Sequence, residues 1–314
     1  MKIVFFGTPE FAVESLDALR NAGHEIAAVV TMPDKTGGRG HHVIESDVKK
    51  YAVANGLPVL QPEKLRDPEF LETLRGFEAD LFIVIAFRML PEAVWAMPPL
   101  GTFNLHASLL PDFRGAAPIN HAIIEGRAES GVTTFMLTHG MDTGGILMQQ
   151  STPLSDDDDA GTLHDRLMHI GADVVVRTVK GLEEGSLQPV PQDDSLATPA
   201  PKIFKNTCLI DFNRPTRKVF DFIRGHSPYP AAWGVVTEDN GREFEAKVIK
   251  ADIVGLSQVE IPEGIAPSSI FSRGGHMYVA TADGLIEILE IQPAGKRRMD
   301  ARAFLAGYHP VKFI

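Results

Sequence analysis

The first half of the chain alternates mainly apolar runs with stretches in which apolar residues recur at helical spacing. The apolar runs, which are expected to form strands, occupy residues 2–6, 24–31, 57–60, 80–87, 101–106 and 132–138. The stretches with helical spacing occupy residues 9–22, 46–55 and 67–76. The run at 80–87 shows no alternation of polar and apolar residues, which is typical of a strand covered on both faces. This pattern predicts an α/β domain with an open, mostly parallel, Rossmann-like sheet and helices on both of its faces.

The pattern breaks at residues 183–203, where the sequence EEGSLQPVPQDDSLATPAPKI contains four prolines and no periodicity. This composition is typical of a linker. Beyond it, one helix is predicted at 214–224. Short strands are predicted at residues 232–236, 243–251, 276–281 and 284–291. They indicate a smaller C-terminal β-barrel, of the OB type. We therefore divide the chain into a first domain (1–183), a linker (184–205) and a second domain (206–314).

Length and composition fit a globular protein of two domains. The chain has 314 residues, of which 44% are hydrophobic and 23% are charged, and this length exceeds the usual size of one domain. No apolar run approaches the ~20 residues that a membrane-spanning helix needs. The initial MKIVFFGTPEF is better explained by a buried first strand than by a signal peptide. Cys208 is the only cysteine, which excludes an intrachain disulfide and a multi-cysteine zinc site and fits a reducing cytoplasm.

Charge is distributed unevenly between the two halves. The formal net charge is −11, which argues against a general nucleic-acid-binding protein. Residues 1–200 hold 15 Lys and Arg against 28 Asp and Glu, whereas residues 201–314 hold 15 against 13. This asymmetry indicates that the acidic part and the nearly neutral part perform different tasks.

Two glycine-containing segments have both a functional and an ordinary explanation. The sequence FFGTPEFA (5–12) places Gly7 between a strand and a helix, where ligands often bind in such sheets. It lacks the G-x-G-x-x-G pattern, so we expect no nicotinamide cofactor, and a tight turn before Pro9 explains Gly7 equally well. The sequence GGRG (37–40) fits either a loop that contacts phosphate or a surface loop with an incidental arginine.

The sharper signal is a set of three polar residues at the ends of predicted strands. Asn104 and His106 are two apart, so they point to the same side of a strand. Asp142 follows another strand, within the Gly-rich sequence THGMDTGG. A buried His is often just a satisfied core residue and an Asp in a Gly-rich loop is ordinary turn chemistry, but in an open sheet such strand ends can meet in one crevice.

These three side chains suit a particular kind of chemistry. His and Asn can donate hydrogen bonds to an oxyanion. Asp can orient the His, raise its pKa, or accept a proton from an attacking amine. No Ser or Cys lies in a recognisable activating motif, since there is no G-x-S-x-G. The combination therefore favours acyl transfer between two bound substrates, without a covalent enzyme intermediate.

Taken together, four short motifs resemble the pattern of the folate-dependent formyltransferases. They are Asn104-x-His106, Ser108-Leu109-Leu110-Pro111, Arg114-Gly115 and Asp142-x-Gly144. The resemblance runs through most of the chain. It includes FFGTPEFA, GGRG, RGAAPIN and MDTGGIL, and in the second domain IRGHSPYPAAW (223–233) and GKRRMDARAFLAG (295–307).

The resemblance implies transfer of a formyl group from 10-formyltetrahydrofolate to the α-amino group of methionine on initiator tRNA. The product, N-formylmethionyl-tRNA, serves translation initiation. Asn104 and His106 would stabilise the tetrahedral oxyanion. Asp142 would hold His106 charged and help to take the proton from the amine. The family also implies a cytoplasmic monomer that uses the folate as a co-substrate and needs no metal and no obligate protein partner.

The family likewise implies the residues that bind the two substrates. Ser108, Leu109, Leu110 and Pro111 would form part of the folate pocket, and Phe87, Met89 and Leu90 would line its pterin end. The family's usual Ala-Tyr-Gly is replaced here by the sequence AFR (86–88), which alters the local pterin contacts. The predicted tRNA contacts are Arg39 in the GGRG loop, Lys202 and Lys205 near the linker, and Lys296, Arg297 and Arg298.

Two other functions use part of the same pattern. A formyltransferase that acts on a nucleotide-linked amino sugar would share the catalytic residues but would not need the basic GKRRM sequence (295–299). A catalytically inactive folate- or RNA-binding protein is the alternative from another class, and the intact Asn-His-Asp set argues against it.

Overall fold

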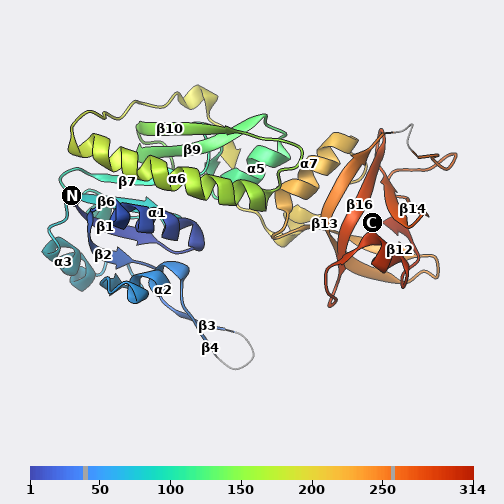
Figure 1. Cartoon of the computed structure of the whole chain (residues 1–314), viewed down its shortest axis with the longest axis horizontal. Coiled ribbons are helices and arrows are strands. Elements are labelled where there is room, and N and C mark those ends of the chain that lie inside the picture. Colours follow the sequence, from blue (N-terminus) through green and yellow to red (C-terminus); the bar gives the residue numbers. More distant parts are fainter. Residues whose placement is uncertain (38–41, 256–258) are drawn as a thin grey trace. The chain divides into compact units, whose positions relative to one another are not determined.

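The computed structural model describes residues 1–37, 42–255 and 259–314. The chain divides into two compact units, both visible in Figure 1. The first unit comprises residues 1–118, 130–152 and 164–200, and the second comprises residues 119–129, 153–163 and 201–314.

A seven-stranded sheet forms the centre of the first unit. Its strands are β1 (Lys2–Gly7), β2 (Glu25–Val30), β5 (Val59–Leu60), β6 (Leu81–Ile85), β7 (Thr102–His106), β9 (Glu129–Met136) and β10 (Ile146–Pro153). Their order is β10-β9-β7-β6-β1-β2-β5. The neighbouring pairs β5–β2, β2–β1, β1–β6 and β6–β7 are all parallel, whereas β9 is antiparallel to β7. The open, mostly parallel, Rossmann-like sheet predicted from the sequence is confirmed.

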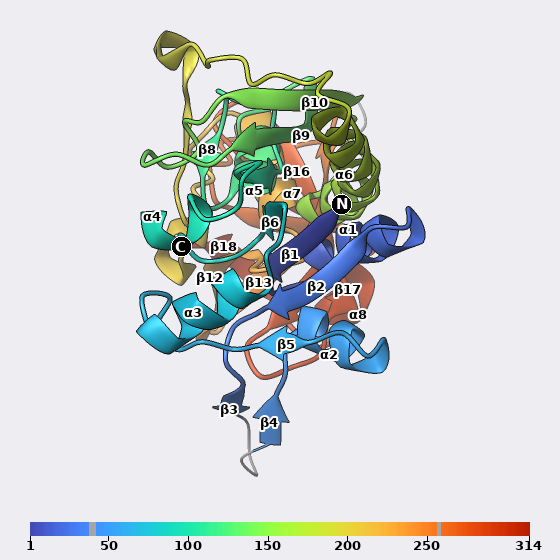
Figure 2. The same cartoon turned by 90° about the vertical axis from the view of Figure 1, so that its left-hand side faces the viewer.

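Helices cover both faces of this sheet. They are α1 (Glu10–Asn21), α2 (Asp47–Ala54), α3 (Pro68–Gly76), α4 (Glu92–Trp95) and α6 (Ala160–Glu183). Figure 2 shows α1, α2 and α6 on one side of the sheet and α3 and α4 on the other. Asp67 begins α3 because its carboxylate accepts the backbone N–H of Glu69, a bond the first turn otherwise lacks. Phe70 and Leu74 of this helix pack against the sheet side chains Val4 and Phe6.

Several short elements were not predicted, because a strand of two or three residues carries no readable period. The strands β3 (Lys35–Gly37) and β4 (His42–Ile44) form an antiparallel hairpin in a stretch that the sequence predicted as a loop. The strands β8 (Arg114–Gly115) and β11 (Pro199–Ala200) form a parallel pair. A short helix, α5, spans Pro118–Ile124, and two 3-10 turns, η1 and η2, span Asp194–Leu196 and Lys205–Cys208.

The second unit contains an antiparallel sheet that closes into a barrel. Its strands are β12 (Ala232–Glu238), β13 (Glu243–Val254), β14 (Ile270–Arg273), β15 (His276–Ala280), β16 (Leu285–Pro293), β17 (Met299–Asp300) and β18 (Pro310–Phe313). Their order is β14-β15-β16-β13-β12-β18, with β17 beside β16. A bridge between Ser269 and Lys312 brings the two ends of the sheet together. The predicted barrel is confirmed, although the sequence did not indicate β14, β17 or β18.

Aromatic and aliphatic side chains fill the barrel, and two helices of the segment 201–314 pack against it. They are α7 (Thr216–His226) and α8 (Ala301–Leu305). The rings of Phe212 and Phe313 pack against each other in the core at a tilt of 31°, with their centroids 5.0 Å apart. On α7, buried Asp221 pairs with Arg224 at 2.9 Å, so neither charge is buried without a partner. Arg224 also donates to the carbonyl oxygens of Ser155 and Asp158, at 2.7 and 3.0 Å. No helix among the described residues has the length and apolar character needed to cross a membrane.

Candidate active site

Strand β7 presents Asn104 and His106 on one face, as their spacing predicts. Asn104 pairs with Val84 of β6 on one side and with Phe135 of β9 on the other. His106, at the carboxyl end of the strand, is almost fully buried, with 6% of its surface exposed. Asn104 is half-buried, and its amide makes no hydrogen bond within the described part of the chain. An amide held on a rigid strand without a protein partner is free to bind a ligand.

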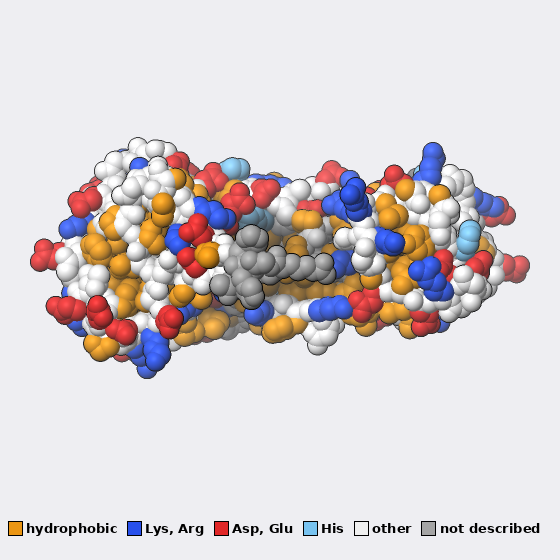
Figure 3. All heavy atoms as spheres, turned by 90° about the horizontal axis from the view of Figure 1, so that it is seen from below, with side chains coloured by type: hydrophobic (Ala, Val, Ile, Leu, Met, Phe, Trp, Pro, Cys, Tyr) orange, Lys and Arg blue, Asp and Glu red, His pale blue; other side chains and the backbone are white. Residues whose placement is uncertain are grey.

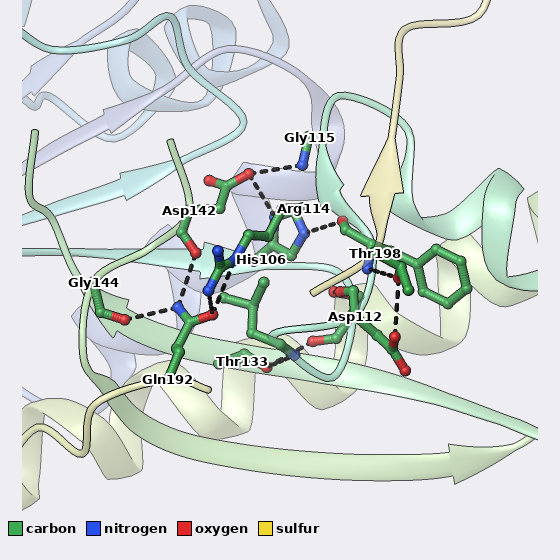
Figure 4. Close-up of polar contacts among 12 residues, drawn as sticks. His106, Asp112, Arg114, Gly115, Thr133, Asp142, Gly144, Gln192 and Thr198 are labelled. Carbon is green, nitrogen blue, oxygen red and sulfur yellow. Dashed lines mark hydrogen bonds and ion pairs between the residues drawn. The ribbon is translucent and has the colours of Figure 1, made fainter. Parts of the chain in front are cut away.

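The two nitrogens of the His106 ring have different surroundings. Nε2 lies 2.8 Å from the carbonyl oxygen of Phe113, and because a carbonyl only accepts, Nε2 carries the proton of this bond. Nδ1 lies 4.0 Å from Oδ2 of Asp142 (Figure 4). Burial lowers the pKa of His106 below its ordinary value, and the charge of Asp142 and the Phe113 carbonyl oppose this shift only in part. Burial therefore opposes the charged ring that the family resemblance implies, whereas Asp142 favours that charged ring.

Asp142 is held in the loop between β9 and β10 by an unusual backbone geometry. Its φ is +55°, a left-handed conformation that Asp tolerates better than most residues. Its Oδ2 accepts the backbone N–H of Gly115 at 2.8 Å. Two residues later, a Cβ on Gly144 would lie 1.6 Å from the carbonyl oxygen of Met136, so only glycine fits. Both features fix the direction in which the Asp142 carboxylate points.

Gln192, which lies in the predicted linker, connects this loop to the β8 strand. Its amide nitrogen donates to the carbonyl oxygens of Asp142 and Gly144, both at 2.8 Å. Its oxygen accepts two N–H groups from Arg114, at 3.1 and 2.7 Å. Figure 4 shows all four residues around the candidate site. The sequence offered no signal for Gln192, because it lies in a proline-rich stretch without periodicity.

Thr198, also in the predicted linker, fixes the chain that follows His106. Its hydroxyl accepts the N–H of Phe113 at 2.8 Å and donates to the carboxylate of Asp112 at 2.9 Å. Its carbonyl oxygen accepts the N–H of Arg114 at 2.9 Å, beside the parallel pair of β8 and β11. Phe113 provides the carbonyl that binds the His106 ring, so Thr198 orients that ring indirectly, through Phe113.

A buried threonine on β9 organises the loop that was predicted to contact folate. The hydroxyl of Thr133 donates to the carbonyl oxygen of Ser108 at 2.6 Å. It accepts the backbone N–H of Leu110 at 3.0 Å and the side-chain amide of Gln149 at 2.9 Å. One donor and two acceptor positions are therefore all used, which is the full capacity of a hydroxyl group.

The four residues of the predicted folate segment differ in accessibility. Leu109 and Pro111 are half-buried, whereas Ser108 and Leu110 are only 1% and 3% exposed. The Ser108 hydroxyl donates to the carbonyl of Asp112 at 2.6 Å, which gives this side chain a role within the loop. In this conformation, Leu109 and Pro111 are the members of the segment that a ligand can reach.

The residues predicted to contact the pterin, which follow β6, also differ in solvent exposure. Met89 is 67% exposed, and Phe87 is half-buried with its ring 5.8 Å from that of Phe6. Leu90 is 6% exposed and belongs to the core beneath α4. Between them, Arg88 donates to the carbonyl oxygens of Pro62 and Glu63. The residue that departs from the family pattern thus ties this loop to a neighbouring segment of the backbone.

The predicted tRNA contacts on the second unit are exposed basic side chains. Arg39 lies outside the described residues. Lys205 pairs with Glu245 at 2.7 Å and also lies 4.9 Å from the Trp233 ring. Arg298 pairs with Glu290. Lys202, Lys296 and Arg297 make no ion pair within residues 1–37, 42–255 and 259–314. On the face of this unit drawn in Figure 3, basic and acidic side chains are interspersed.

No group of three or more His, Cys, Asp or Glu side chains in the described parts of the chain is arranged to hold a metal ion. The fold and the polar residues at its strand ends are consistent with a group-transfer enzyme. Two family models match the chain: "Formyl transferase" over residues 1–179 and "Formyl transferase, C-terminal domain" over residues 202–309. The chain belongs to the formyl transferase family.

Curated relatives that match the chain over nearly its whole length carry the name methionyl-tRNA formyltransferase. The chain is 48% identical to the one from Bacteroides fragilis, over 98% of this chain and 95% of that protein. It is 50% identical to the one from Parabacteroides distasonis, over 99% and 97%. Among solved structures it resembles the N-formyltransferase from Helicobacter canadensis in complex with folinic acid and dTDP-3-aminofucose. That match has a TM-score of 0.65 at 19% identity, over 95% of this chain and 100% of that one, and it supports the fold.

Proposed function

We propose that this chain transfers a formyl group from 10-formyltetrahydrofolate to the α-amino group of methionyl initiator tRNA. The observation that carries the proposal is the meeting of His106 and Asp142, at 4.0 Å, at the end of the strand that also carries Asn104, whose amide has no hydrogen-bond partner among the described residues. The substrate assignment rests on the methionyl-tRNA formyltransferases that are 48–50% identical to the chain over almost its full length.

The reaction joins an amine to a formyl carbon and separates that carbon from N10 of the folate. The amine nitrogen attacks the formyl carbon, and the electron pair of the C=O bond moves onto the oxygen. The Asn104 amide donates a hydrogen bond to this oxyanion, which holds more charge than the ground-state carbonyl. When the intermediate collapses, the bond to N10 breaks, and N10 takes up one proton. The products are a formamide on the methionine and tetrahydrofolate.

His106 and Asp142 together accept the proton that the attacking amine loses. Because Nε2 is engaged by the Phe113 carbonyl, Nδ1 is the atom that can gain a proton. A proton accepted at this pair charges the ring next to the Asp142 carboxylate, and the resulting Nδ1–H can stabilise the oxyanion. Asp142 thus stabilises the charged ring in the transition state rather than in the free enzyme. Burial, which lowers the pKa of His106, favours the unprotonated Nδ1 that this step requires.

The residues around the site fit a folate. A pterin is flat and largely apolar with polar edges, so it suits a site with apolar walls and a few placed polar groups. Partly exposed Phe87 and Met89 follow β6, and Asn104 lies on the adjacent strand β7. Leu109 and Pro111 extend the accessible apolar surface after β7. Ser108, Leu110 and Leu90 support this surface from within the protein.

The tRNA is assigned to the basic side chains named above and to Arg39. Exposed Lys and Arg bind phosphate by charge, and those without a carboxylate partner, such as Lys202 and Arg297, do so without breaking an ion pair. In this proposal residues 1–183 carry catalysis, 184–205 connect the domains, and 206–314 bind tRNA. The protein acts in the cytoplasm as a monomer.

The test is formylation of a defined set of acceptors. Purified protein is incubated with 10-formyltetrahydrofolate and either methionyl initiator tRNA or a nucleotide-linked amino sugar. Formyl-methionine on the tRNA supports the proposal. Formylation of the sugar alone would show that the chain is a formyltransferase acting on nucleotide-linked amino sugars. Folate binding without transfer to either acceptor would indicate an inactive binding protein.

A further inference from the structure

We propose that Gln192 is a positioning residue that holds the Asp142 loop in its catalytic geometry. This inference rests on the proposed function, because it assigns Gln192 a task in that reaction. Gln192 is 50 residues from Asp142 along the chain and binds the loop through two side-chain hydrogen bonds. It lies outside the sequence motifs that contain Asn104, His106 and Asp142.

The contacts of Gln192 fix the backbone that directly follows the Asp142 side chain. Its amide nitrogen uses both of its hydrogens, one on the carbonyl of Asp142 and one on that of Gly144, each at 2.8 Å. Asp142, at the start of this turn, has a left-handed φ of +55°, which other contacts must maintain. A side chain that clamps two carbonyls of one tight turn supplies such contacts.

The orientation of the Gln192 amide follows from its partners. Carbonyl oxygens only accept and a guanidinium only donates, so the nitrogen must face the turn and the oxygen must face Arg114. Arg114 donates two N–H groups to that oxygen. Its guanidinium also forms an ion pair with Asp194 at 2.7 Å. No other amino acid of this length offers two donors on one side and a neutral acceptor on the other.

The hydrogen bonds form a closed ring around Asp142, as Figure 4 shows. The Asp142 carboxylate accepts the N–H of Gly115, the residue after Arg114. Arg114 holds Gln192, and Gln192 holds the carbonyl of Asp142. The dipeptide Arg114-Gly115 is thus tied to Asp142 twice, once directly and once through Gln192. Loosening one link should let the carboxylate drift from Nδ1 of His106.

The main test compares Gln192→Glu with wild type. This change keeps an oxygen for Arg114 but removes both donors and sets a charged oxygen against the two carbonyls. We expect kcat to fall about 10- to 100-fold, because small misplacements of a catalytic group cost that much. We expect the KM for the folate to change by less than about twofold, since Gln192 contributes to the geometry of the transition state. Gln192→Ala, which introduces no charge, should behave in the same way.

Two further readouts separate positioning from general damage. The acid limb of the pH profile of kcat/KM should move to lower pH, because a more distant Asp142 no longer raises the pKa of His106. Amide hydrogen exchange should accelerate in peptides covering 113–116 and 140–145, which contain the closed ring of hydrogen bonds around Asp142. The matched control is Gln150→Glu. Gln150 also accepts an N–H from an arginine, Arg177, at 2.8 Å. Gln150 lies on β10 and is not part of the hydrogen-bond ring around Asp142.

The outcomes are distinguishable from those of the proposed function. If wild type forms no formyl-methionine, the proposed function fails, and the exchange rates still decide whether Gln192 holds the loop. If wild type is active, the loss of kcat in both Gln192 variants but not in the control supports the inference. Wild-type kcat, pH profile and exchange rates in Gln192→Glu would overturn it. A loss of the same size in Gln150→Glu would also contradict it.

Discussion

Nδ1 of His106 faces Oδ2 of Asp142 at 4.0 Å, while Nε2 of the same ring is bound to the carbonyl of Phe113. This arrangement fixes which nitrogen can change its protonation state. It also gives the carboxylate a defined effect, since its charge raises the pKa of a ring that burial otherwise lowers. Several consequences for activity depend on this pair.

Replacing Asp142 with Asn should reduce kcat by about 10²- to 10⁴-fold, the usual contribution of a group that moves a proton. The pH dependence has a definite sign. Burial already lowers the pKa of His106, so wild-type kcat/KM should begin to fall below the ordinary His pKa of about 6.5. Without the Asp142 charge that pKa is lower still, so the acid limb of Asp142→Asn should lie at lower pH. The measurement is kcat/KM between pH 5 and 8, at about one-unit steps or finer.

The control for this experiment is Asp173→Asn, which removes an exposed carboxylate paired with Arg177 at 3.1 Å and leaves the His106 ring untouched. Its acid limb should match that of wild type. An acid limb that moves to higher pH in Asp142→Asn would contradict the assigned relationship between the two residues.

Replacing Asn104 with Ala should lower kcat by about 10²- to 10³-fold, as expected for the loss of one oxyanion donor. The dissociation constant of a folate analogue without a formyl group should change little, because the oxyanion is absent from that complex. Steady-state kinetics and equilibrium binding measure the two effects. A variant that lost folate affinity and kept its kcat would place Asn104 in substrate binding instead.

Replacing Thr133 with Val should destabilise the protein by about 1–3 kcal/mol, the cost of leaving buried partners without a hydrogen bond. Valine has nearly the same shape, but it removes the acceptor of the Leu110 N–H and the donor to the Ser108 carbonyl. Urea denaturation measures the free energy of unfolding. The folate KM should rise as well, because the loop that includes Leu109 loses its anchor.

Thr73→Val is the matched control for Thr133. Its hydroxyl donates to the Glu69 carbonyl on the exposed face of α3. This change should alter the free energy of unfolding by no more than about 0.5 kcal/mol. Equal destabilisation by both substitutions would show that the network around Thr133 has no special role.

Replacing Lys296 and Arg297 with Ala should weaken tRNA binding without affecting folate binding. Each lost phosphate contact should reduce the salt slope of log K by about 0.9, using the duplex DNA value as a guide. Arg39→Ala should act in the same direction. Titrations at several salt concentrations measure this slope, with Arg75→Ala on α3 as a control. A folate affinity that fell as far as the tRNA affinity in Arg39→Ala would rule out the loop's assignment to tRNA.

The sequence could predict the sheet and the spacing of the polar residues on it. Asn104 and His106 share a face because strand side chains alternate, and the apolar run around them marks the strand. Asp142 could be linked to them because a Gly-rich loop follows the neighbouring strand. These features are local, so they can be predicted without knowing the packing.

The remaining features of the site depend on contacts between distant segments. Gln192 and Thr198 lie in an aperiodic stretch, and their role appears only when that stretch packs beside β8. The lowered pKa of His106 depends on its burial, which a motif does not encode. Leu90 resembles a ligand contact by position, but the packing of α4 places it in the core.

The most direct test of the central claim is the formation of N-formylmethionine on initiator tRNA. Wild type and Asn104→Ala are incubated with 10-formyltetrahydrofolate and methionyl initiator tRNA, and the amino acid is released by mild base and identified by mass spectrometry. Wild type should yield formyl-methionine, and Asn104→Ala should form it about 10²- to 10³-fold more slowly. Unmodified methionine from folded, folate-binding wild-type protein would contradict the account.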